Sequence, residues 1–138
     1  MHARLDASIR GRITADVTAG EYGYTLPYFQ HMLAAGAVDC LQADVTGCGG
    51  ITVRPRVAAL AQAHGLGISG HCAPHAHAAA CVPNLRHLEW FHDHVRIERL
   101  LFDGALDPSG GAITPSSDGP PGPGLSLDTE RGQPFRTR

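Results

Sequence analysis

Four ionisable residues recur along the chain at intervals that suggest one repeating structural unit. They are Glu21, Asp44, His71 and Glu89, separated by 23, 27 and 18 residues. A histidine can act as a general base near neutral pH, and a carboxylate can hold its second ring nitrogen or bind a hard cation. If the fold brings these groups together, they form a site that can move protons.

Each of the four residues comes at or just after the end of an expected β-strand. Short, mostly apolar runs bounded by turn residues predict buried strands at 15–20, 38–43, 67–70 and 85–90. The first helix between them should begin at the cap Thr25 and end at Gly36, and the others should cover about 53–64 and 73–82. We place Pro55 in the first turn of the second helix, whose start should therefore be irregular.

Strands that alternate with helices through short connections predict an α/β fold of parallel βαβ units. The carboxyl ends of parallel strands meet at one rim, which is where such folds place their chemistry. The four ionisable residues should therefore meet at this rim, which makes them a better candidate site than any local motif.

The chain changes character after the fourth strand. From Leu100 the run LLFDGAL predicts a strand or hairpin arm, and the Gly/Pro-rich segment after it has too little apolar content to fold alone. We therefore divide the chain into a poorly determined N-terminal segment (1–14), an α/β part (15–106) and an extended Gly/Pro-rich tail (107–138).

Composition argues against several classes of function. The formal net charge is −2 at pH 7 and the basic residues are all arginine and scattered, so no nucleic-acid partner is expected. No uncharged apolar run reaches the length of a membrane span, and the N-terminus lacks the apolar stretch of an export signal. The four cysteines form no C-x-x-C pair, which favours reduced thiols and a cytoplasmic protein.

Histidines and cysteines are densest in the segment GHCAPHAHAAAC. Its potential zinc ligands are Cys72, His75, His77 and Cys81. A zinc site built from them would require the expected helix to break, and their spacing matches none of the usual paired-ligand patterns. A non-catalytic metal-binding protein based on this cluster is nevertheless kept as an alternative hypothesis.

The other histidines and cysteines receive no chemical role. Surface or loop positions are expected for His87, His92 and His94. Burial as small apolar side chains is expected for Cys40 and Cys81.

Four motifs, in the right order and at suitable spacing, resemble one family. They are AGEYGYTLPYF, AGAVDCLQADVTGCGGIT, VAALAQAHGLGISGHCAPH and NLRHLEWF. They are similar to the C-terminal part of the enolase superfamily barrel, in the mandelate racemase and muconate lactonizing enzyme branch, which includes the sugar-acid dehydratases. The resemblance runs from about 15 to 106, and GPGLSLD near the C-terminus is similar to the usual ending of the family.

The resemblance implies a modified (β/α)8 TIM-type barrel, of which this chain would supply three to four βα units. It implies that Glu21 is the third ligand of a Mg²⁺ ion, because a dianionic enediolate needs a hard divalent cation. It also implies that Asp44 and His71 form a catalytic dyad, in which Asp44 holds one ring nitrogen and the other faces the substrate. Glu89 would lie beside the developing enolate and donate a proton to its oxygen.

The family also has parts that this sequence does not contain. Two earlier metal carboxylates, a lysine-bearing strand and an N-terminal capping domain should precede Glu21, and the chain has no lysine. We therefore expect the chain to be the C-terminal third or so of such an enzyme, inactive alone because two metal ligands are missing.

The expected reaction is abstraction of the proton α to the carboxylate of a small-molecule sugar acid, followed by loss of the β-hydroxyl in a dehydratase. A racemase or epimerase of a 2-hydroxy acid is the alternative, and the sequence leaves both open. A further hypothesis is a split barrel that is active only with a partner supplying the first half. The resemblance also implies that the full-length parent is a homo-oligomer.

Overall fold

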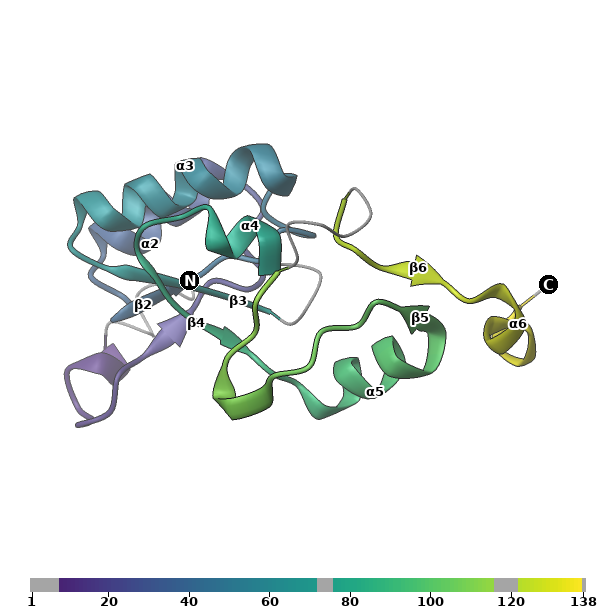
Figure 1. The fold of residues 1–138 in the computed structure, drawn as a ribbon. Helices are drawn as coiled ribbons and strands as arrows, with labels where there is room; N and C mark the ends of the chain where they lie inside the picture. The colour runs from purple at the N-terminus through teal and green to yellow at the C-terminus, as the bar shows by residue number, and fades with distance from the viewer. Residues whose placement is uncertain (1–7, 72–75, 116–121, 138) are drawn as a thin grey trace.

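A four-stranded parallel sheet organises the chain, which the computed structural model describes over residues 8–71, 76–115 and 122–137. The strands are β1 (Thr18–Ala19), β2 (Cys40–Gln42), β3 (Gly67–His71) and β4 (Leu85–Glu89), which pair in that order (Figure 1). The helices between them are α2 (Leu26–Ala34), α3 (Gly50–Ala63) and α4 (Ala76–Ala80). All three strand pairs are parallel, so the predicted α/β fold is confirmed.

Local sequence explains where α2 begins and ends. The hydroxyl of Thr25 accepts a hydrogen bond from the backbone N–H of Tyr28, and Pro27 lies in the first turn. Gly36 follows the helix with a φ of 60°, a left-handed conformation that glycine adopts without strain. The cap and the stop predicted for this helix are therefore confirmed.

The start of α3 differs from the prediction. The helix begins at Gly50 rather than near Val53, so Pro55 lies inside it and not in its first turn. Gly49 precedes the helix with a φ of 102°, and a Cβ at this position would lie 2.8 Å from a methyl carbon of Val53. The glycine pair thus allows an early start that other residues would obstruct, and Pro55 removes only one amide donor from the helix.

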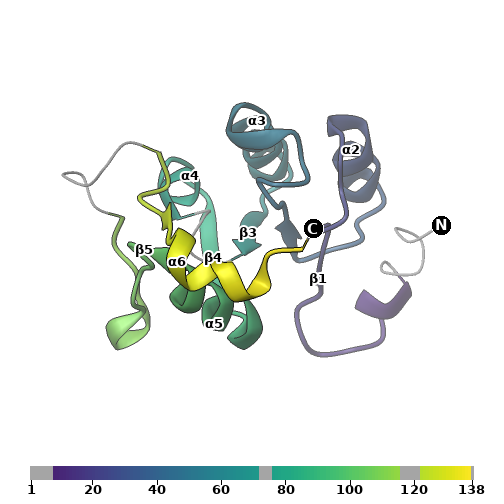
Figure 2. The same ribbon diagram turned by 90° about the vertical axis from the view of Figure 1, so that its right-hand side faces the viewer.

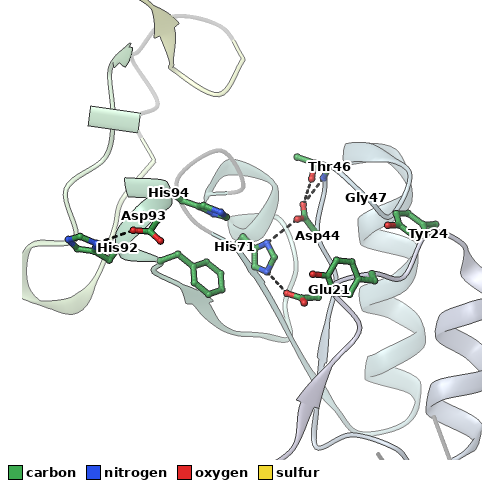
Figure 3. Close-up of a pocket in the computed structure, with 11 residues that line it drawn as sticks. Glu21, Tyr24, Asp44, Thr46, Gly47, His71, His92, Asp93 and His94 are labelled. Atoms are coloured by element: carbon green, nitrogen blue, oxygen red, sulfur yellow. Dashed lines mark hydrogen bonds and ion pairs between the residues drawn. The ribbon is translucent and has the colours of Figure 1, made fainter. Parts of the chain in front are cut away.

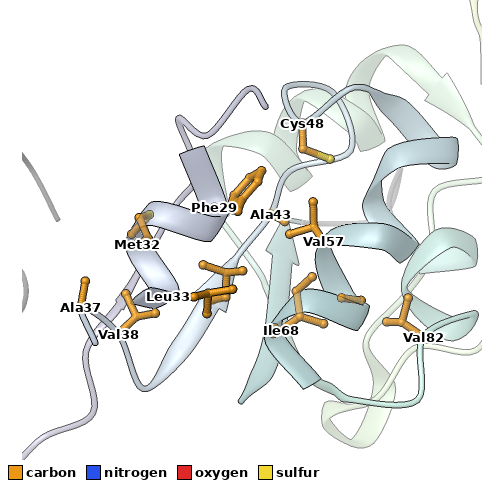
Figure 4. Packing of buried hydrophobic residues seen from close by; sticks show 13 residues of the cluster. Phe29, Met32, Leu33, Ala37, Val38, Ala43, Cys48, Val57, Ile68 and Val82 are labelled. Carbon is orange, nitrogen blue, oxygen red and sulfur yellow. The ribbon is translucent and has the colours of Figure 1, made fainter. Parts of the chain in front are cut away.

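The core lies between one face of the sheet and the helices α2 and α3 (Figure 4). These side chains are at most 4% exposed: Phe29, Met32 and Leu33 from α2, Val57 and Ala61 from α3, and Leu41 and Ile68 from β2 and β3. Burial of an apolar side chain of Val, Leu or Phe size contributes about 1.5–3 kcal/mol. This packing fixes the strands relative to one another, and with them the rim at their carboxyl ends.

The chain beyond β4 leaves the core. Helix α5 (His92–Leu101) begins directly after the rim. His87 in β4 and His92 and His94 in the first turn of α5 are exposed, so the surface positions expected for them are confirmed. Figure 2 shows α5 on the other side of the sheet from α2 and α3. The strand or hairpin arm expected over LLFDGAL is confirmed at β5 (Phe102–Asp103), which pairs antiparallel with β6 (Ser126–Leu127), whereas Leu100 and Leu101 belong to α5.

Short elements occupy the rest of the described tail. They are the 3-10 turns η2 (Ser109–Gly111) and η3 (Gln133–Phe135) and the helix α6 (Thr129–Gly132). Their side chains include none that is buried, as expected for a segment with little apolar content. The three-part division of the chain at residues 14 and 106 stays a prediction.

The described cysteines contribute packing rather than chemistry. Cys40 and Cys48 are buried and Cys81 is exposed, so the predicted burial is confirmed for Cys40 and wrong for Cys81. Burial raises the pKa of the Cys40 and Cys48 thiols, which makes them poor nucleophiles. Within the described ranges no helix has the length and apolar character needed to cross a membrane.

Candidate active site

The four residues predicted to form a site meet at the carboxyl ends of the four strands. His71 is the last residue of β3 and Glu89 the last of β4, and the two are register partners in that ladder. Glu21 and Asp44 lie just beyond the ends of β1 and β2. Figure 3 shows Glu21 and Asp44 on either side of the His71 ring. The structure thus brings the predicted residues together, and their catalytic roles stay a prediction.

His71 and Asp44 form a largely buried hydrogen-bonded pair. Nδ1 of His71 lies 3.0 Å from Oδ2 of Asp44, and the two side chains are 12% and 16% exposed. Because an ionised carboxylate only accepts, Nδ1 carries the hydrogen. Oδ1 of Asp44 accepts from both the backbone N–H and the hydroxyl of Thr46, each at 2.7 Å. Asp44 is therefore held in place and selects the tautomer of His71 that has no hydrogen on Nε2.

Three side chains surround Nε2 of His71. The carboxylates of Glu21 and Glu89 approach it to 3.6 and 3.8 Å, and the side-chain nitrogen of Gln42 to 3.2 Å. The same nitrogen of Gln42 donates to Oε1 of Glu89 at 2.5 Å. An amide oxygen in its place would face a carboxylate, so the nitrogen is the group that must point toward Glu89. Gln42 therefore donates to Nε2 as well, which agrees with the tautomer that Asp44 selects.

Gln42 was not among the residues predicted to form the site. It lies in β2 and is 6% exposed, with its side chain directed at the site rather than at the helices. The available signal was a polar residue inside the apolar run VDCLQA, two positions before Asp44. Such a residue in a buried strand needs a hydrogen-bond partner, and the strand end is where polar partners are.

Arg54 is a second residue whose position was not predicted. It is 0% exposed in α3, donates to the carbonyls of Ala43 and Ala78, and keeps a third nitrogen, Nη2, without a partner among the described residues. Burial lowers the pKa of its guanidinium. A Cβ on Gly70 would lie 3.2 Å from Nη2. Arg54 thus contacts the residue before Asp44 and faces the residue before His71, and its place on the apolar face of α3 was the available signal.

A pocket of about 600 Å³ opens over the dyad. Phe91 forms part of its wall and packs edge-to-face on His71, with ring centroids 5.1 Å apart and planes at 81°. The other described lining residues are Glu21, Tyr22, Tyr24, Asp44, Thr46, Gly47, His71, His92, Asp93 and His94. The dyad is therefore accessible to a small molecule from this side.

The described residues match one part of a magnesium site and not a complete one. Glu21 offers a carboxylate that is 37% exposed and faces the pocket, which suits a hard cation. No group of three or more potential ligand side chains that could hold a metal exists in residues 8–71, 76–115 and 122–137. Glu21 can thus serve as one ligand, and the others would have to come from other strands.

The zinc hypothesis concerns residues that are only partly described. Cys72 and His75 lie outside the described residues. Of the other two candidates, Cys81 is exposed and donates from its thiol to the backbone carbonyl of His77. That contact uses a backbone carbonyl, so it gives no support to a ligand pair.

Comparisons with known proteins identify the family of this chain. Residues 2–132 match the family described as enolase C-terminal domain-like. This chain belongs to that family. A probable glucarate dehydratase of Streptomyces coelicolor is 32% identical over 120 residues, which cover 78% of this chain and 26% of the relative. The predicted enolase-superfamily resemblance is therefore confirmed.

Solved structures of the enolase superfamily that match this chain are longer than it is. A mandelate racemase/muconate lactonizing enzyme-like protein from Rubrobacter xylanophilus is 48% identical, with a TM-score of 0.83 over 96% of this chain and 36% of that protein. An enolase from Bradyrhizobium, in complex with magnesium and mandelic acid, is 26% identical, with a TM-score of 0.83 over 99% of this chain and 36% of its own. The chain thus has the fold of the C-terminal part of the superfamily barrel and spans about a third of these structures.

Proposed function

We propose that this chain is the C-terminal part of a magnesium-dependent enzyme that removes the proton α to the carboxylate of a sugar acid and expels the β-hydroxyl. The observation that carries the proposal is the Asp44–His71 pair, with Glu21 and Glu89 within 4 Å of Nε2 of His71. Similarity to a probable glucarate dehydratase supports a sugar acid as the substrate class. A cytoplasmic location and a homo-oligomeric whole enzyme belong to the same proposal.

His71 is the proposed base. With Nδ1–H donated to Asp44, the lone pair of Nε2 faces the site and can take the α-proton. The ring then becomes cationic, and the Asp44 carboxylate stabilises the imidazolium. Gln42 must give up its hydrogen bond to Nε2 at this step, while its bond to Glu89 keeps the amide in place.

The two carboxylates beside Nε2 have separate proposed roles. Glu21 would bind Mg²⁺, which when present offsets the negative charge of the enediolate. Glu89 would share a proton with an enolate oxygen. The electron pair left by the α-proton then expels the β-hydroxyl, and the proton on Nε2 of His71 leaves with it as water. Tautomerisation of the resulting enol gives a 2-keto acid.

Racemisation or epimerisation of a 2-hydroxy acid is the second candidate. It is supported by the Bradyrhizobium enolase that holds mandelic acid, a 2-hydroxy acid. The first step is the same, but the α-carbon is reprotonated and no hydroxyl is lost. Formation of a 2-keto acid distinguishes the first candidate from the second.

Complementation tests the proposed function. The chain is mixed with the portion of the Rubrobacter xylanophilus protein that it does not match, and the complex is incubated with Mg²⁺ and a panel of sugar acids in deuterated water. We expect exchange of the α-proton and formation of a 2-keto acid. His71→Asn should abolish exchange, whereas His64→Asn, an exposed position at the end of α3, should leave the rate unchanged.

Three results would contradict this proposal. A folded complex that exchanges the α-proton of no sugar acid would overturn the function. Exchange that survives His71→Asn would remove His71 from the role of base. Failure of the two polypeptides to associate would argue against completion of a barrel by this chain.

A further inference from the structure

The first turn of α5 forms the wall of the pocket opposite Asp44. Phe91, His92, Asp93 and His94 all line the pocket that opens over His71. The mechanism above uses none of the polar side chains in this turn. Its two histidines are therefore available for another task.

The two histidines point in different directions. The ring of His94 lies 6.4 Å from that of His71, measured between centroids, and 5.3 Å from that of Phe91. His92 lies near Asp93, with 3.4 Å between Nδ1 and the carboxylate, and its side chain is 90% exposed. Figure 3 shows His94 beside His71 and His92 turned away from it. Only His94 can therefore meet a molecule bound at the dyad.

The charges in the pocket give His94 a specific importance. Glu21, Asp44 and Asp93 line the pocket, whereas none of its described lining residues is Lys or Arg. An anionic or hydroxyl-rich ligand needs hydrogen-bond donors. The hydroxyls of Tyr22, Tyr24 and Thr46 come from the loops after β1 and β2, so on the wall formed by α5 the imidazoles are the side chains that can donate. His71 is already engaged by Asp44, Gln42 and the two glutamates, which leaves His94 as the donor on the far side of the base.

We propose that His94 determines substrate specificity by donating a hydrogen bond to an oxygen on the distal part of a sugar acid, beyond the carbons that react. This inference rests on the proposed function, which places the α-carbon of the substrate at His71. The next carbons of the chain then pass beside Phe91 and reach His94. A terminal hydroxyl and a second carboxylate present the same chemistry to the imidazole, namely an acceptor oxygen.

Equilibrium binding of three acids tests this role in the complemented complex with Mg²⁺. D-galactonate carries distal hydroxyls, D-glucarate adds a second carboxylate, and lactate has no oxygen beyond its α-carbon. His94→Leu should weaken binding of glucarate by about 10- to 150-fold, the range for a hydrogen bond to a charged group, and binding of galactonate by about 2- to 13-fold, the range for neutral groups. Lactate binding should change less than twofold, because lactate does not reach His94. A larger loss for glucarate than for galactonate identifies a carboxylate as the acceptor.

His64→Leu is the control. It removes an exposed imidazole at the end of α3, outside the pocket, so all three affinities should stay within twofold of the wild type. If His94 only packs against Phe91, His94→Leu will weaken all three acids alike or none of them. Either result overturns the proposal. The proposal is also overturned if neither galactonate nor glucarate binds.

The outcome separates this inference from the proposed function. Binding of galactonate that depends on His94, without exchange of its α-proton, would retain the specificity role and reject the reaction. Exchange of the α-proton at equal rates in the wild type and in His94→Leu would retain the proposed reaction and reject the specificity role. If no complex assembles, the imidazole resonances of His94 are measured by NMR in the chain alone. These resonances should shift when galactonate is added and not when lactate is added. The absence of a shift with galactonate overturns the proposal.

Discussion

Replacement of Asp44 by asparagine should reverse the tautomer of His71. Oδ1 of Asp44 accepts two hydrogen bonds from Thr46, one of them from the backbone. In the variant the amide oxygen must take this position, because an amide nitrogen would face two donors. The amide nitrogen of Asn then replaces Oδ2 and points at Nδ1 of His71, which can only accept from it. A neutral ring must then carry its hydrogen on Nε2.

That tautomer conflicts with the second neighbour of the ring. Gln42 directs its amide nitrogen at Nε2 of His71, where an N–H would now meet another donor. The nearest acceptors, the carboxylates of Glu21 and Glu89, lie at 3.6 and 3.8 Å, beyond hydrogen-bond distance. A neutral imidazole has one acceptor nitrogen, so it cannot satisfy donors on both sides. The ring is 12% exposed, and a buried donor without an acceptor costs about 1–3 kcal/mol. Asp44→Asn should therefore lower both the activity and the stability.

The effect on rate should be far larger than the effect on folding. Loss of the correct histidine tautomer lowers turnover about 10⁴-fold in serine proteases when the orienting aspartate becomes asparagine. The same factor for α-proton exchange corresponds to about 5.4 kcal/mol of activation free energy. Asp93→Asn is the matched control, since Asp93 lies in the same pocket with a side chain 81% exposed.

Two assays check this reasoning. Proton–nitrogen couplings of the His71 ring report its tautomer in the chain alone, and exchange in deuterated water reports the rate in the complemented complex. A double-mutant cycle with Gln42→Leu should recover about 1 kcal/mol or more of the stability lost in Asp44→Asn, without recovery of the rate. A variant that keeps its hydrogen on Nδ1, or that loses less than tenfold in rate, would refute the account of the dyad.

Two further predictions concern stability. Ile68→Ala should lower the free energy of unfolding by about 2–5 kcal/mol in a urea titration, because Ile68 is 0% exposed at the centre of the core, and a loss below about 1 kcal/mol would contradict that packing. Burial raises the pKa of Glu98, and His94 partly opposes the shift. The stability that this group contributes is therefore present below its unfolded pKa of about 4.3 and is lost as the pH rises through its pKa in the folded protein. Glu98→Gln should therefore raise the urea midpoint at pH 7 and leave it unchanged near pH 3, and equal effects at both pH values would reject this explanation.

The strands and the site residues at their ends could be predicted from the sequence. Each strand is a short apolar run followed by polar residues, and each helix between them has a cap or a stop such as Thr25 or Gly36. Parallel connections then require the strand ends to meet at one rim. For this reason the sequence brings Asp44 and His71, which are 27 positions apart, to one rim, and the family resemblance then pairs them as a dyad.

Three features could not be predicted, because they depend on contacts between distant residues. Helix α5 buries only Val95 and Glu98 and leaves its apolar residues Ile97 and Leu100 exposed, so it does not follow the usual pattern of an apolar face turned toward the core. The bond from Gln42 to Glu89 joins strands that are not neighbours in the sheet and spans 47 positions. Burial of Arg54 needs the space left by Gly70, which local patterns do not reveal.

The order of the strands has a consequence for synthesis of the chain. Because β1, β2, β3 and β4 lie side by side in the order in which they are made, each new strand meets an edge that already exists. At about 5–20 residues per second, the roughly 70 residues from β1 to β4 take about 4 to 14 seconds to emerge. The site residues follow the same order. Glu21 and Asp44 are synthesised before His71, and Glu89 is synthesised last and completes the group.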